Sequence, residues 1–167
     1  RIVYRCVFCH NAYPKLEAGA DKYETALAVY PAEMPKGIDC ERCHGPGAEH
    51  VRTRTASTIV NPARLSRSLQ MDVCMQCHLE TTSAPLPNSV LKAGRSVFSF
   101  RPGEALLSYA AYFDLPDPGT RDSFNIVHQA YRLRQSECFR QTDTTCTTCH
   151  DPHRKPENPQ AHFPGST

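Results

Sequence analysis

Apolar residues in this chain occur in short groups separated by polar residues, prolines and glycines. The clearest helical spacing lies in residues 122–139, where Phe124, Val127 and Tyr131 fall on one face of a helix. A second, shorter helix is predicted around residues 23–30. Helices of this length need a surface to pack on, because they are not stable alone in water.

Turn signals organise the rest of the chain. Asn61 followed by Pro62 is typical of a helix start and predicts a helix that runs towards Cys74. Residues 100–106 predict a turn followed by a short helix. No segment of any length alternates apolar and polar residues as a half-buried strand does. The pattern therefore predicts mainly coil with short α-helices and little or no β-structure.

The composition limits how large a protein core can be. The 167 residues fit one compact domain or two very small ones. Hydrophobic residues make up 40% of the chain, but nine of them are cysteines, and there are 14 prolines and no tryptophan. These residues are too few for a large helical or sheet-based interior. We therefore expect something other than side chains to fill the interior.

The charges and the apolar runs exclude two classes of partner. The 19 basic and 17 acidic side chains are interspersed and give a formal net charge of +2, which disfavours nucleic acid. No apolar run approaches the roughly 18 residues of a membrane-spanning helix, so no membrane span is predicted. The chain begins at Arg1, five residues before the first cysteine, which we interpret as the processed start of an exported protein.

Eight of the nine cysteines form four pairs of identical spacing, and a histidine follows each pair at once. C-x-x-C-H is the pattern of covalent haem c attachment, so the sequence predicts four haem c groups. The four motifs are Cys6-Val7-Phe8-Cys9-His10, Cys40-Glu41-Arg42-Cys43-His44, Cys74-Met75-Gln76-Cys77-His78 and Cys146-Thr147-Thr148-Cys149-His150.

The spacing within the motif has a chemical reason. Two thiols three residues apart on a helical turn can each add to one vinyl group of a haem, and the next histidine then binds the iron. Zinc knuckles, thioredoxin-like redox pairs and disulfides also use C-x-x-C, but they give no reason for a fixed histidine. We expect the haems to form the core of a single tetrahaem domain, residues 1–167, and the haem-free chain to fail to fold.

The remaining histidines match the number of open iron positions. Four haems with histidine on both faces need eight histidines, and the chain has eight. A saturated iron has no position for a substrate, so the count favours electron transfer over catalysis at iron. The four candidate distal ligands are His50, His128, His153 and His162. The alternatives are free surface histidines or a sixth ligand from Met34, Met71 or Met75.

Three of these histidines lie in segments with distinct signals. His50 follows a glycine-containing turn at residues 45–47 that can present it to a neighbouring haem. His153 is too close to His150 to reach the far face of the same haem, so it should serve another one. His162 lies on a proline-rich tail, where disorder is the default expectation.

Residues 79–145 carry no attachment motif and are rich in proline and glycine, so we expect a loop-rich insert that covers haem edges. His128 lies in this insert and shares a helix face with apolar residues, as a core histidine also would. Cys138, the cysteine outside the motifs, is expected to be buried beside Phe139, and pairing with another chain is the alternative.

Several stretches carry a resemblance to a known family; they are residues 37–50, 100–103, 135–139 and 145–153. They resemble multihaem c-type cytochromes related to the tetrahaem electron carrier of ammonia-oxidising bacteria. The resemblance implies that histidines placed like His50, His128 and His153 are distal ligands. One haem of that carrier lacks a second protein ligand, whereas this chain has a histidine for every position, so catalysis is not carried over.

The sequence thus predicts an electron carrier, not an enzyme, with four bis-histidine haem c groups. It is expected outside the cytoplasm, periplasmic or extracellular, exchanging electrons with redox proteins or extracellular acceptors. One extension is a conducting filament in which copies of the chain share axial histidines, motivated by the early Cys6 and by His162 on the tail. The alternative function is a domain of a multihaem oxidoreductase, or a small one, with one open haem acting on a nitrogen compound.

Overall fold

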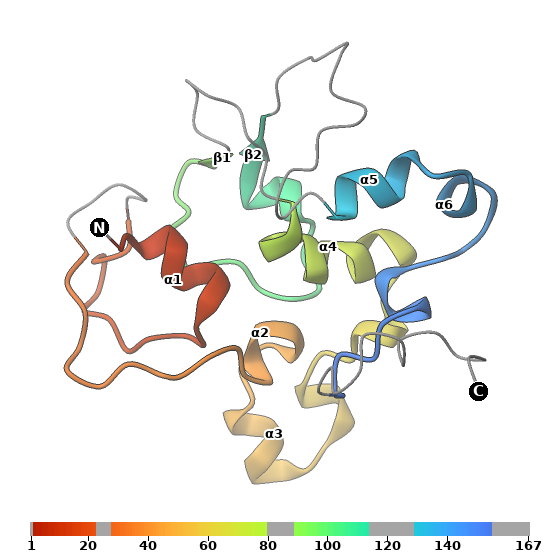
Figure 1. The fold of residues 1–167 in the computed structure, drawn as a ribbon. Helices are drawn as coiled ribbons and strands as arrows, with labels where there is room; N and C mark the ends of the chain where they lie inside the picture. The colour runs from red at the N-terminus through yellow and green to blue at the C-terminus, as the bar shows by residue number, and fades with distance from the viewer. Residues whose placement is uncertain (1, 23–27, 80–88, 114–128, 155–167) are drawn as a thin grey trace.

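The computed structural model describes residues 2–22, 28–79, 89–113 and 129–154, and all structural statements below refer to these residues. They form mainly coil with short helices and one two-stranded sheet, which confirms the predicted fold class (Figure 1). The α-helices are α1 Tyr4–His10, α2 Glu41–His44, α3 Ala48–Thr53, α4 Arg67–His78, α5 Gln129–Gln135 and α6 Glu137–Gln141. Single 3-10 turns are η1 Ala56–Thr58, η2 Pro62–Arg64, η3 Leu106–Ser108 and η5 Cys146–Thr148.

The sheet joins two three-residue strands, β1 Ser89–Leu91 and β2 Ala110–Tyr112. They run antiparallel, with Ser89 opposite Tyr112 and Leu91 opposite Ala110. Strands this short show no alternating apolar and polar pattern in the sequence. Because Ala110 is buried against the core, tertiary packing and not local propensity forms this sheet.

The helix predicted after Asn61 and Pro62 is divided into two elements. The Asn61 side chain accepts a hydrogen bond from the Ala63 amide and opens only the short turn η2. Helix α4 begins five residues later, where the Ser66 hydroxyl accepts from the Leu69 amide. Both residues are good N-caps, and each opens its own element.

The helix predicted for residues 122–139 is also divided in its described part. Helices α5 and α6 meet at Ser136, whose backbone is extended and whose hydroxyl caps α6 by accepting from the Phe139 amide. Residues 122–128 lie outside the described part. For the helix expected around residues 23–30, residues 28–30 are not helical, and residues 23–27 lie outside the described part.

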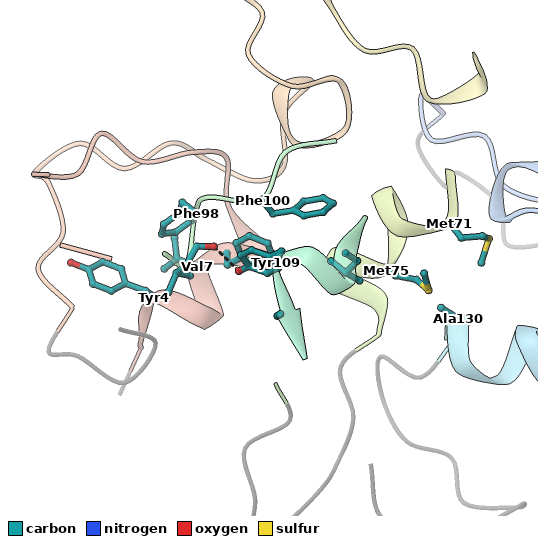
Figure 2. Close-up of a cluster of buried hydrophobic side chains, with 12 residues drawn as sticks. Tyr4, Val7, Met71, Met75, Phe98, Phe100, Tyr109 and Ala130 are labelled. Carbon is teal, nitrogen blue, oxygen red and sulfur yellow. Dashed lines mark hydrogen bonds between the residues drawn. The ribbon is translucent and has the colours of Figure 1, made fainter. Parts of the chain in front are cut away.

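A compact apolar cluster lies between α1, α4 and the segment before β2 (Figure 2). The rings of Phe8 and Tyr109 stack with centroids 5.7 Å apart, and Phe100 meets Tyr109 edge-on at 5.6 Å. The Tyr109 hydroxyl donates to the Val97 carbonyl at 2.7 Å. The buried members are Tyr4, Val7, Phe8, Met71, Met75, Val97, Phe98, Phe100, Leu106, Tyr109, Ala110 and Ala130.

The segment 97–110 therefore has a larger role than the cover for haem edges that the sequence indicated, because it supplies half of this cluster. Two carboxylates hold it in place. Asp21 accepts from the Phe98 amide at 2.8 Å, and the buried Asp72 of α4 accepts from the Leu106 amide at 3.0 Å. Helix α4 lies centrally and contacts both α1 and α5 (Figure 1).

The cluster gives a stability prediction. We expect Phe100→Ala to lower the free energy of unfolding of the haem-loaded protein by about 3–5 kcal/mol, because a fully buried ring is replaced by a cavity. Leu107→Ala, at a position 69% exposed in the same segment, should change it by less than about 0.5 kcal/mol. Guanidinium unfolding followed by circular dichroism measures both; equal effects would show that Phe100 carries no core packing.

Candidate haem-binding site

Every attachment motif lies on a helical turn. Helix α1 contains the first motif, α2 with its N-cap Cys40 forms the second, α4 ends with the third, and η5 opens the fourth. On such a turn, residues three apart lie on the same side, which is what two thioether bonds to one haem require. All nine cysteines lie within the described residues and carry free thiols, so none is used in a disulfide.

Thiols from different motifs meet around the end of α4. The Cys9 thiol donates a hydrogen bond to Cys77, and this bond, followed by the positive charge of Arg42, lowers the pKa of Cys77 to about 7 although burial opposes it. The Cys74 thiol donates to Cys146 and lowers the pKa of Cys146 to about 7. The first and the fourth attachment motifs are therefore each direct neighbours of the third.

The second motif also lies near the end of α4. Burial raises the pKa of the Cys43 thiol, and the nearby Cys77 raises it further. The third motif, at the end of α4, thus has a thiol beside a thiol of each of the other three. Haems attached at these positions would share one compact region around α4.

The proximal histidine of the second motif is held in a defined orientation. His44 Nδ1 lies 2.8 Å from the Val60 carbonyl oxygen, to which it donates, and the Val60 amide donates back to the His44 carbonyl at 3.0 Å. A proton on Nδ1 leaves the lone pair on Nε2 for a metal, which is the usual arrangement of a metal-binding imidazole.

One of the two described candidate distal ligands, His50, is oriented in the same way as His44. His50 lies on α3, after a turn at Gly45, whose φ of +78° favours glycine. The Nδ1 atom of His50 is 3.1 Å from the Thr55 carbonyl oxygen. His153 Nδ1 is 3.8 Å from an Asp151 carboxylate oxygen. In His50 the Nδ1 atom is hydrogen-bonded and Nε2 is left for another partner, whereas the contact of His153 is longer than a hydrogen bond.

The imidazoles of His44 and His153 lie next to each other as a stacked pair. Their ring centroids are 6.1 Å apart and their planes differ by 13°. An imidazole nitrogen binds a metal at about 2 Å and lies about 1 Å from its ring centroid, so two imidazoles on opposite sides of one metal have centroids about 6 Å apart. The centroid separation would suit two imidazoles that hold one iron, with each ring turned so that its Nε2 points at the metal, and His153 lies beside the second motif instead of its own.

The other predicted ligands lie at the ends of helical turns, in or against the core cluster, or outside the described residues. His10, His78 and His150 are exposed at the ends of their turns, and His128 and His162 lie outside the described residues. Met71 and Met75 are each 1% exposed within the core cluster, and Met34 packs against it half-buried.

The donor groups fit haem better than a zinc site. Across residues 2–22, 28–79, 89–113 and 129–154, no three histidine, cysteine or acidic side chains converge as a metal ion would need. Paired thiols on single turns and paired imidazoles are instead the donor set of a c-type haem. Held by such a set, haem supplies reversible one-electron chemistry at its iron.

The prediction for Cys138 was wrong. Its side chain is exposed, and its sulfur lies 3.7 Å from the Thr144 hydroxyl. The neighbouring Phe139 faces inward, where the Arg67 guanidinium lies 3.8 Å from its ring centroid. Successive residues of a helix point about 100° apart, so packing Phe139 turns Cys138 outward.

Sequence reasoning overlooked two buried polar residues inside the motifs. Arg42 is 1% exposed and Gln76 is 2% exposed. The only signal was their position between two cysteines, which does not distinguish a buried side chain from an exposed one.

Comparison with known proteins supports the haem assignment. Residues 2–45 match the family model described as cytochrome c554 and c-prime, a segment that contains the first two motifs. This similarity supports c-type haem as the cofactor and electron transfer as its use. No curated protein and no solved structure matches the chain.

A separate finding concerns membranes: among the described helices, none has the length and apolar character needed to span one.

Proposed function

We propose that this chain is a tetrahaem electron carrier in which each iron is held by histidine on both faces. The observation that carries the proposal is the neighbouring pair His44 and His153, whose centroid separation of 6.1 Å would suit two ligands of one iron once their Nε2 atoms turn towards it. Because the two residues come from segments far apart in sequence, the fold would bring the second ligand to this iron. An iron saturated by the protein is suited to electron transfer and offers no position to a substrate.

The residues of the chain act by fixing geometry. Val60 and Thr55 orient the imidazoles of His44 and His50 through their carbonyl oxygens. The thiol contacts across motifs support haems packed around α4, close enough for electrons to pass between them. Arg67 holds the fourth motif near α4 by donating to the Thr144 carbonyl at 3.0 Å.

The setting of the carrier follows from its chemistry. Covalent haem attachment takes place on exported chains, so the proposal includes a periplasmic or extracellular location. Its partners are redox proteins or extracellular acceptors. If copies share axial ligands through His162, the protein forms conducting filaments, which negative-stain images of concentrated protein would reveal and discrete particles would contradict.

The proposal is tested by a haem count and a spin-state measurement on the purified protein. We expect a pyridine haemochrome assay to give four haems per chain and low-temperature EPR of the oxidised protein to show low-spin ferric signals only. A high-spin signal from one haem per chain would contradict the saturated iron and support the alternative oxidoreductase. Fewer than four haems would contradict the attachment at all four motifs.

A further inference from the structure

The third residues of the first three motifs converge in the interior. Phe8, Arg42 and Gln76 occupy the same position between the two cysteines of their motifs, and they are 0%, 1% and 2% exposed. The equivalent Thr148 of the fourth motif is exposed. The helical turns of the first three motifs thus contact one another through the residue that precedes the second cysteine. The residue in contact with both others, Arg42, carries a positive charge.

Arg42 is held at this junction by contacts to all sides. Its Nη2 donates to the Phe8 carbonyl, and its guanidinium carbon lies 4.2 Å from the Phe8 ring centroid and 4.5 Å from that of Tyr13. The Arg42 carbonyl accepts from Gln76 Nε2 at 2.9 Å. Two aromatic faces stabilise the charge without neutralising it.

The charge of Arg42 has no counter-ion in the described part of the chain. Its Nε and Nη1 are buried there without a hydrogen-bond partner, and it forms no ion pair with a described carboxylate. The adjacent Glu41 is occupied by the Gly47 amide, which donates to it at 2.7 Å. A second cation, Arg5, lies over the same Phe8 ring at 5.1 Å. Among the described residues, the junction thus brings together two cationic side chains and one aromatic ring.

We propose that Arg42 raises the reduction potentials of the haems attached to the first three motifs, an inference that rests on the proposed function. Reduction adds one electron to a ferric iron and lowers the positive charge of the haem by one. A buried cation nearby disfavours the ferric form more than the ferrous form. Arg42 directly precedes Cys43, and its hydrogen-bond partners Phe8 and Gln76 directly precede Cys9 and Cys77, so its charge lies beside the attachment edges of these haems.

The expected change in the midpoint potential of a haem can be calculated from Coulomb's law. A unit charge about 10 Å from an iron, at an effective dielectric constant of about 20, changes the equilibrium between ferrous and ferric forms by more than tenfold. For a one-electron couple, each tenfold change corresponds to about 59 mV. An exposed charge at the same distance has a much smaller effect because water and salt screen it.

The test compares variants of the haem-loaded protein by spectroelectrochemical titration. We expect Arg42→Met, which removes the charge and retains the bulk, to lower at least one midpoint potential by about 59 mV or more. Arg42→Lys should stay close to the wild-type values. Arg52→Met is the matched control, because Arg52 is 71% exposed and pairs with Glu49. Unchanged potentials in Arg42→Met, or equal losses in Arg42→Met and Arg42→Lys, would overturn the proposal.

A second pair of variants applies if Arg42→Met fails to take up haem. Gln76→Glu leaves Arg42 in place and adds a carboxylate beside it, so it should lower the potentials, whereas Gln76→Met should not. Absence of that difference would overturn the role of the charge. Haem count and EPR of the wild-type protein are measured first, so a failure of the carrier proposal appears there and a failure of the Arg42 proposal appears only in the variants.

Discussion

Replacing His153 with alanine is expected to leave one of the four irons with a single protein ligand. The His153 imidazole lies beside that of His44 at a centroid distance of 6.1 Å, and its side chain is 78% exposed, so little packing depends on it. The oxidised variant should show a high-spin EPR signal from one haem per chain. The reduced variant should bind one equivalent of carbon monoxide, which the wild-type protein should not bind.

Two further variants make the assignment of His153 specific. Arg154→Ala, at a neighbouring position 82% exposed, should remain entirely low-spin. In a background that lacks the second haem through Cys40→Ala and Cys43→Ala, adding His153→Ala should create no high-spin signal, because the iron that it serves is gone. A high-spin signal in that background would assign His153 to another haem, and an unchanged spectrum of the single variant would remove it from the ligand set.

The fold class could be predicted from the sequence, but the element boundaries could not. Short apolar groups and frequent prolines indicate coil and short helices, as observed. The division at Ser136 was missed because serine occurs both inside helices and as an N-cap, and here its hydroxyl caps α6 by accepting from the Phe139 amide. The sheet of β1 and β2 was missed for a related reason, since long-range packing and not local pattern creates it.

In the candidate site, too, local features could be predicted from the sequence and long-range contacts could not. The attachment motifs are local, so five consecutive residues carry their signal and place each one on a helical turn. The proximity of His44 and His153 joins segments more than a hundred residues apart, and only the fold brings them together. Arg42 was missed because burial of a charge depends on its neighbours Phe8 and Tyr13, which no spacing rule encodes.

Loss of individual haems is expected to destabilise the protein unequally. The first motif contributes Val7 and Phe8 to the core cluster, and the third contributes Met75. The fourth motif has no buried residue, because its turn η5 lies at the surface. Removing the first haem through Cys6→Ala and Cys9→Ala should therefore lower the unfolding temperature far more than removing the fourth through Cys146→Ala and Cys149→Ala.

Protein in which all eight motif cysteines are changed to alanine should lose cooperative unfolding altogether. Its described helices span 4 to 12 residues, and isolated helices of this length are marginal in water. Twelve buried apolar residues cannot alone offset the conformational entropy of ordering the chain, about 1–2 kcal/mol for each backbone residue. Thermal melts followed by circular dichroism measure this series. A haem-free chain that melts cooperatively with native helix content would show that the aromatic cluster around Tyr109 is sufficient, and that haem supplies only redox chemistry.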